Sequence, residues 1–194
     1  MVQELREHYA FKFGLLSQAE AEKVISLGFS KQLPPKTIFR EIGQEDYRLA
    51  YVLKGMLRTY QLNDKGEEIT TFLTFEHDHS MSLRTILNGE GSRYMVQSVE
   101  ETMLLCIDYR DLMEVSKKNP GFQSAYRFFA ERVILELLGR IDNFVRKSPE
   151  ERYLDLLQKR PGIFSRIAAK DIAYFLGVTP VSLSRLRKRV QQKS

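Results

Sequence analysis

The segment from position 169 to 189, AKDIAYFLGVTPVSLSRLRKR, restricts the fold more than any other part of the chain. Apolar residues at helical spacing predict a first short helix with Ile172, Ala173 and Leu176 on its inner face. Gly177 lies at the following bend, where a residue with positive φ ends a helix. Because Ala173 is small, a second helix can approach it closely. The pattern therefore predicts two helices that cross at a tight turn.

The second helix of this segment has its own signals. Thr179 is a favourable cap and Pro180 a favourable first residue, while Leu183 and Leu186 are spaced to turn inward. Small and basic side chains without a carboxylate remain on the outer face, and they are Val181, Ser182, Ser184, Arg185, Arg187, Lys188 and Arg189. Such a face suits the major groove of DNA. The alternative is a basic amphipathic helical hairpin that has no nucleic-acid partner.

The net charge of +5 is distributed unevenly along the 194 residues. From Lys159 onward there are nine basic residues and one acidic residue, Asp171, which gives +8, so the first 158 residues sum to −3. A compact basic end on a mildly acidic body is typical of a nucleic-acid-binding unit joined to another domain, because Lys and Arg neutralise phosphates and release counterions. A basic face that is merely solvated is the alternative.

Composition argues against several classes of protein. No run of about 18 apolar residues is present, and the first residues, MVQELREHYAFKFGLL, include acidic side chains where an export signal is basic. We therefore expect a cytoplasmic protein that does not associate with membranes. Cys106 is the single cysteine, so neither an internal disulfide nor a cysteine-ligated cluster is expected within one chain.

In the rest of the chain, the spacing of the apolar residues changes twice. Residues 1–31 read as helical, with Ser17 as a cap. From Pro34 onward six short β-branched or aromatic segments alternate with turns, which predicts an antiparallel roll or barrel. The segments are KTIFREIG, YRLAYVLKG, MLRTYQLN, EEITTFLTF, RYMVQSVE and TMLLCID. Gly66 favours a hairpin between the third and fourth. A short helix is expected after Asp108.

A long helix is predicted over residues 121–147, and it has two apolar rows. We assign the first row to a dimer seam, formed by Phe129, Val133, Leu137, Ile141 and Phe144. The second row consists of Ile134, Leu135, Leu138 and Val145. One row can pack on the roll and the other on a partner; the alternative is a helix buried wholly within its own chain. Ser148 and Pro149 close this helix and open the next.

With these residues in place, the whole chain resembles the catabolite-activator and fumarate-nitrate-reductase (Crp/Fnr) regulators of bacteria. The stretch DIAYFLGVTPVSLSRLRKR is the most specific part, and it looks like the short members common in Bacteroidetes. The resemblance implies an α+β fold: an N-terminal antiparallel β-roll of the cyclic-nucleotide-binding jelly-roll type, a long dimerisation helix and a C-terminal winged helix-turn-helix domain. We place these parts at residues 1–118, 119–148 and 149–194, and any wing would lie within residues 160–168.

The resemblance also implies partners and site residues. It predicts a homodimer that binds a two-fold-symmetric operator in double-stranded DNA and contacts RNA polymerase. Val181, Ser182 and Arg185 fall where base-contacting residues are expected, and Thr179 where a hydroxyl meets phosphate. Further DNA contacts are assigned to Ser184, Lys188 and Arg189.

The effector site departs from the family pattern. Cyclic-nucleotide binders have a Gly-Glu pair before a short helix and an Arg-hydroxyl pair after it, which hold the ribose and the cyclic phosphate. Here Met81 and Ser82 occupy the positions of the Gly-Glu pair. Ser92 and Arg93 occupy the positions of the Arg-hydroxyl pair, in the reverse order. In a strand this displacement sends Arg93 to the opposite face. We therefore do not expect cyclic AMP to bind in the familiar way.

A different, unknown small anion, or no effector, is the expectation that remains. The residues available to such a pocket are Ser82, Leu83, Arg84, Ser92 and Arg93. We predict no haem, iron–sulfur or other cofactor, since the chain lacks the cysteine and histidine ligands such groups require.

The alternative interpretation of the function is a metal-dependent enzyme. His77 and His79, two residues apart in a barrel, are able to ligate a metal as in cupin enzymes. Because no further ligand is apparent downstream, a polar loop is the preferred interpretation, and we predict no metal site. Motifs for nucleophilic catalysis and for phosphate-binding loops are also absent from the sequence, so we expect a protein that is not an enzyme.

Overall fold

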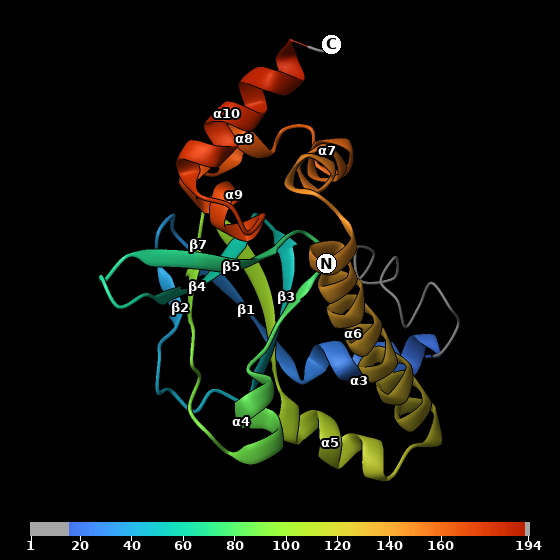
Figure 1. Ribbon diagram of the computed structural model, residues 1–194. Coiled ribbons are helices and arrows are strands. Elements are labelled where there is room, and N and C mark those ends of the chain that lie inside the picture. The colour runs from blue at the N-terminus through green and yellow to red at the C-terminus, as the bar shows by residue number, and fades with distance from the viewer. Residues whose placement is uncertain (1–15, 193–194) are drawn as a thin grey trace.

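A computed structural model describes residues 16–192. Two four-stranded antiparallel sheets form an N-terminal roll (Figure 1), with strand orders β1-β8-β3-β6 and β2-β7-β4-β5. The strands are β1 Gly28–Leu33, β2 Ile38–Arg40, β3 Arg48–Lys54, β4 Leu57–Leu62, β5 Glu68–Thr74, β6 His79–Ser80, β7 Met95–Ser98 and β8 Thr102–Asp108. The predicted α+β fold with an antiparallel β-roll is confirmed.

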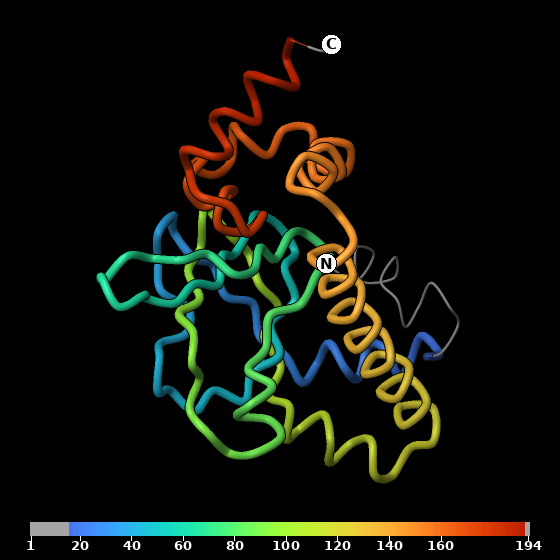
Figure 2. The backbone as a smooth tube through the Cα atoms, viewed as in Figure 1, coloured from blue at the N-terminus to red at the C-terminus, as the bar shows by residue number. Residues whose placement is uncertain are grey.

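Helices surround the roll and make up the whole C-terminal part that is described. They are α3 Gln18–Ser26, α4 Leu83–Asn88, α5 Tyr109–Lys117, α6 Pro120–Arg146, α7 Pro149–Lys159, α8 Ile163–Arg166, α9 Ala169–Phe175 and α10 Pro180–Gln191. Figure 2 shows the long α6 running along one side of the roll, from α5 to α7. The helices α7 to α10 then gather over one end of the sheets (Figure 1).

Local signals in the sequence explain several of these boundaries. The side chain of Ser17 caps α3 and that of Ser148 caps α7, and each forms a capping box with the glutamate three residues later. Pro149 occupies the first turn of α7, where its missing N–H costs nothing. Gly66, with φ of 76°, closes the β4–β5 hairpin. The predicted hairpin, long helix and start of α7 are confirmed.

The hydrophobic core of the described residues has three clusters: one inside the roll, one between the roll and the helices α3 and α5, and an upper cluster where α7 to α10 meet the roll. The upper cluster joins Met56, Leu73 and Phe75 of the roll to apolar side chains of α7 to α10. The latter are Tyr153, Leu156, Ile163, Ile167, Ile172, Ala173, Leu176, Leu183 and Leu186. The C-terminal helices therefore share a core with the roll in this structure.

Two expectations about secondary structure were wrong. Residues 28–31, expected to be helical, begin strand β1, because Gly28–Leu33 pairs with β8 over its whole length. The part of this predicted helix that precedes position 16 lies outside the described residues. The segment 160–168, suggested for a wing, forms the short helix α8, and no strand follows β8 in the described part of the chain. The C-terminal unit is thus helical from α7 to α10.

Candidate nucleic-acid interface and roll cavity

The helices α9 and α10 form the expected helix-turn-helix. Gly177 has φ of 69° and ends α9 as predicted. The hydroxyl of Thr179 accepts a hydrogen bond from the backbone N–H of Ser182 at 3.1 Å, which starts α10. Leu183 and Leu186 are buried against the upper core. The turn and the inner face therefore lie where the spacing placed them.

The outer face of α10 is free of carboxylates and open to solvent. Val181 is 60% exposed, and the other exposed residues of the predicted DNA-binding set are Thr179, Ser182, Ser184, Arg185, Lys188 and Arg189. Arg187 instead lies over the ring of Phe164 at 4.2 Å. Arg189 pairs with Glu150 of α7 at 2.7 Å, a contact that the sequence did not indicate.

Ion pairs hold the helix-turn-helix on the roll. Arg58 of β4 donates to a carboxylate oxygen of Asp171 in α9 at 2.8 Å. Arg166 of α8 pairs with Glu76 at 2.6 Å and also with Glu100. Hydrogen bonds to these two carboxylates, Glu100 first, outweigh burial and raise the pKa of Arg166. The two groups of ion pairs fix the orientation of α8 and α9 relative to the sheets.

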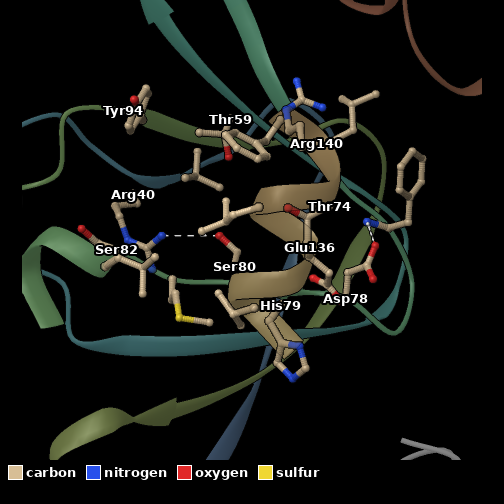
Figure 3. A pocket seen from close by; sticks show the side chains of 18 of the residues that line it. Arg40, Thr59, Thr74, Asp78, His79, Ser80, Ser82, Tyr94, Glu136 and Arg140 are labelled. Carbon is tan, nitrogen blue, oxygen red and sulfur yellow. Dashed lines mark hydrogen bonds between the residues drawn. The ribbon is translucent and has the colours of Figure 1, made fainter. Parts of the chain in front are cut away.

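A cavity of about 710 Å³, here called the roll cavity, lies between the roll and α6 (Figure 3). All the residues suggested for an effector pocket line it, namely Ser82, Leu83, Arg84, Ser92 and Arg93. In Figure 3, Arg40 and Ser82 lie toward one end of the cavity, and Asp78 and Arg140 toward the other. The structure thus brings the five together in one lining, and their role in binding stays a prediction.

Several of these polar groups already have partners within the chain. Ser82 caps α4, its hydroxyl oxygen accepting from the backbone N–H of Thr85. Arg84 forms an ion pair with Glu90. The hydroxyl of Ser92 donates to the carbonyl of Tyr94 at 2.8 Å. A ligand at this end would have to share or displace these contacts.

Arg40 is a cavity-lining residue that the sequence reasoning missed. It is 1% exposed, and its guanidinium donates to Asp46 at 2.9 Å, to the hydroxyl of Ser80 at 3.4 Å and to the carbonyl of Arg48 at 3.1 Å. Burial lowers the pKa of Arg40, although the Asp46 carboxylate opposes this. An arginine at the end of a three-residue strand has no spacing pattern that marks it as buried, so only the fold reveals this side chain.

The histidine pair has structural partners. The Nδ1 atom of His77 lies 2.9 Å from the hydroxyl of Tyr51, and the His79 ring packs edge-on against Phe129 at 4.8 Å. Within residues 16–192, no group of three or more histidine, cysteine, aspartate or glutamate side chains is arranged to hold a metal ion. The geometry therefore does not support the cupin-like enzyme alternative.

In the single chain, most of the row that we assigned to the dimer seam contacts the rest of its own chain, and the seam stays a prediction. Phe129 packs on His79 of the roll, and Val133 and Leu137 line the roll cavity. The centre of the Phe144 ring lies 5.1 Å from the guanidinium carbon of Arg140 and 4.9 Å from that of Arg152. Apart from Ile141, the expected seam thus contacts its own chain. The large apolar side chains of α6 that are 52–78% exposed are Ile134, Leu135, Leu138, Ile141 and Val145. We call these five the outward row.

The described helices include none that is long and apolar enough to cross a membrane. No protein-family model and no curated protein matches the chain.

Solved structures with the same fold are nevertheless numerous, and three of them illustrate the similarity. FixK2 from Bradyrhizobium japonicum is 14% identical, with a TM-score of 0.67 over 86% of this chain and 85% of that chain. The c-di-GMP responsive global regulator CLP of Xanthomonas campestris is 15% identical, with a TM-score of 0.67 over 89% of this chain and 90% of that one. The catabolite activator protein of Thermus thermophilus is 19% identical, with a TM-score of 0.55 over 92% and 85%. The fold implied by the resemblance to Crp/Fnr regulators is confirmed.

Proposed function

We propose that this protein is a cytoplasmic transcriptional regulator of the Crp/Fnr type, which binds DNA as a homodimer through α9 and α10. The observation that carries the proposal is the outer face of α10, which is exposed, basic at its C-terminal half and free of carboxylates. An α-helix with such a face fits the major groove. Fold similarity to solved regulators supports the same conclusion. The protein acts by binding rather than by catalysis.

Within α10, different residues have different roles. Arg185 is exposed in the middle of the helix, where a guanidinium reaches O6 and N7 of a guanine. Val181 and Ser182 at its start contact a thymine methyl and a base edge. Lys188 and Arg189, nearer its end, contact phosphates. Since Arg189 also pairs with Glu150, its phosphate contact competes with an ion pair inside the chain.

The homodimer forms through α6, with the outward row as its seam. Ile134, Leu138, Ile141 and Val145 follow one another at steps of four, three and four residues, the spacing of a two-stranded coiled coil. This stripe is exposed in the single chain, and a long exposed apolar stripe marks an interaction site. A partner's α6 on this stripe would set two copies of α10 on successive major-groove faces.

The roll cavity holds either an effector other than cyclic AMP or no effector at all. The place of the ribose-binding glutamate is taken by Ser82, which caps α4, and Arg93 is exposed at the cavity rim. The cavity needs neither a metal nor another cofactor for this role. RNA polymerase is the expected protein partner of the DNA-bound dimer.

The decisive experiment selects an operator from a random DNA library with the purified protein and then titrates variants against that operator and scrambled DNA. Arg185→Ala should weaken operator binding by about 1–3 kcal/mol and relax the preference at one base pair of each half-site. Lys188→Ala should weaken both DNAs alike and lower the slope of log K against log salt by about one unit. Arg110→Ala, on α5 and paired with Asp108, is the matched control and should change neither.

Two results would contradict the proposal. Failure of the protein to enrich any sequence, together with no salt-dependent binding to random DNA, would leave the helix-turn-helix without a nucleic-acid partner. Equal losses for Arg185→Ala on operator and scrambled DNA would make Arg185 a phosphate contact and transfer base recognition to Val181 and Ser182.

A further inference from the structure

A second cavity, of about 600 Å³, lies at the junction of α6 with α7 and α9, and we call it the hinge cavity. Its charged lining residues are Glu136, Arg140, Arg152, Asp155, Lys159 and Arg160. Of the two carboxylates, Asp155 is already paired with Lys147, which lies outside the lining. The hinge cavity therefore presents an excess of positive charge.

Arg140 is a half-buried member of this set. Its guanidinium donates to the carbonyl oxygens of Thr71 and, at 3.2 Å, Phe175, and its carbon lies 4.6 Å from the centre of the Phe72 ring. Burial lowers the pKa of Arg140 to about 10, so the group stays cationic at neutral pH. Among the residues described, it has no carboxylate within ion-pair distance. A desolvated cation without a counter-ion is costly, so an anion beside Arg140 would be favoured.

The neighbouring cations are similarly placed. Arg152 donates to the carbonyl oxygens of Leu176 at 3.0 Å and Lys147 at 2.6 Å. Arg160 lies over the ring of Phe75 at 4.5 Å. In the part of the chain described, neither arginine has a carboxylate partner within ion-pair distance. Guanidinium groups bind phosphate and carboxylate through paired hydrogen bonds, so the lining suits an anion with two negative charges.

Arg140 and Arg152 touch the DNA-facing unit. Phe175 is the last residue of α9 and Leu176 is its C-cap, and both carbonyl oxygens accept from the hinge cations. Cations stabilise the C-terminal end of a helix, where carbonyl groups lack helical partners. A ligand that draws Arg140 or Arg152 toward itself must weaken these contacts. The hinge cavity is thus linked directly to the first helix of the helix-turn-helix.

We infer that the hinge cavity binds a small organic anion with two negative charges, and that its occupant changes the affinity of the helix-turn-helix for DNA. The second half of this inference rests on the proposed function. Apolar side chains of Phe75, Leu156 and Leu176 line the rest of the cavity and match an apolar body on the ligand. The site is separate in part from the roll cavity: Arg152 and Arg160 line only the hinge cavity, and Arg93 lines only the roll cavity.

Calorimetric titration of the full chain with phenyl phosphate tests the site, with benzyl alcohol as a neutral probe of similar shape. Phenyl phosphate should bind at least about ten times more tightly than the alcohol, because the charge supplies the affinity. Arg140→Met should weaken phenyl phosphate about tenfold and Arg160→Met about threefold, while Arg93→Met should leave it unchanged. Should Arg140→Met fail to fold, the exposed Arg160 still decides the outcome.

Three results would overturn the site: no binding of phenyl phosphate, equal binding of the alcohol, or loss of binding in Arg93→Met but not in Arg160→Met. The regulatory half is tested by repeating DNA titrations with saturating phenyl phosphate. An altered dissociation constant in the wild type but not in Arg140→Met supports it, and an unaltered constant in the wild type refutes it. A protein that binds the anion but no DNA would refute the proposed function and leave the site standing.

Discussion

Gly177 connects the turn of the helix-turn-helix to the end of α6, and its replacement by alanine gives a quantitative test of that contact. A Cβ built on Gly177 would lie 2.6 Å from Cε1 of Phe144, at a backbone φ of 69°. The left-handed conformation costs a residue with a Cβ about 1–2 kcal/mol. The clash adds about 1 kcal/mol, the low end for overpacking, since Phe144 is 39% exposed and can shift. Allowing for the loss of unfolded-state entropy, we expect Gly177→Ala to lower the free energy of unfolding by about 2 kcal/mol.

The assay is urea unfolding followed by far-UV circular dichroism, in a double-mutant cycle with Phe144→Ala. In the Phe144→Ala background the clash is absent, so the cost of Gly177→Ala should fall by about 1 kcal/mol and leave only the backbone term. Gly162→Ala is the control: its φ is −89° and the nearest side-chain atom to a Cβ is 3.9 Å away, so it should change stability by less than about 0.5 kcal/mol. Equal costs in both backgrounds would refute the contact with Phe144, and a total below that of the control would refute the backbone strain as well.

Three further outcomes are expected. Leu135→Glu combined with Leu138→Glu should give monomers by light scattering, because both side chains belong to the outward row; an unchanged dimer would place the seam elsewhere. Burial raises the pKa of the Glu76 carboxyl, but hydrogen bonds from Arg166 and from backbone N–H groups, together with the charge of Arg166, hold it below its usual value. The stability from this pair is therefore present at neutral pH and is lost as the pH falls through the lowered pKa. Arg166→Gln should cost about 1 kcal/mol at neutral pH and flatten the acid dependence of urea unfolding; an unchanged dependence would exclude the pair as its cause. Cyclic AMP at about millimolar concentration should leave the melting temperature unchanged, and saturable binding by calorimetry would overturn that expectation.

Much of the local structure was predictable because its causes lie within a few residues. The helix-turn-helix depends on Gly177 and on the cap at Thr179, and both are where the spacing placed them. The β4–β5 hairpin depends on Gly66, and α7 begins at the capping box of Ser148. The roll as a whole followed from short strands separated by turn residues. In each element the decisive interaction is a backbone torsion or a hydrogen bond between near neighbours.

Other features depend on contacts between distant parts of the chain, and these escaped prediction. Strand β1 forms because it pairs with β8. The intrinsic preferences of its residues alone do not distinguish a strand from a helix. Arg40 is buried because the fold brings Asp46, Arg48 and Ser80 around its guanidinium.

The sequence by itself determined which segments are helices, strands and turns over most of the chain, and which residues lie on the outer face of α10. Only the tertiary structure decided how α6 is rotated, and hence which of its two apolar rows meets the roll. The two rows are alike in hydrophobicity, so periodicity cannot separate them; the choice is made by Phe129 packing on His79 and by Phe144 at the turn. Only the fold, likewise, brings Arg140 to the end of α9, because that contact joins groups 35 residues apart in the chain. Spacing encodes the faces of each element, whereas the mutual placement of elements comes from side chains that meet only after the chain has folded.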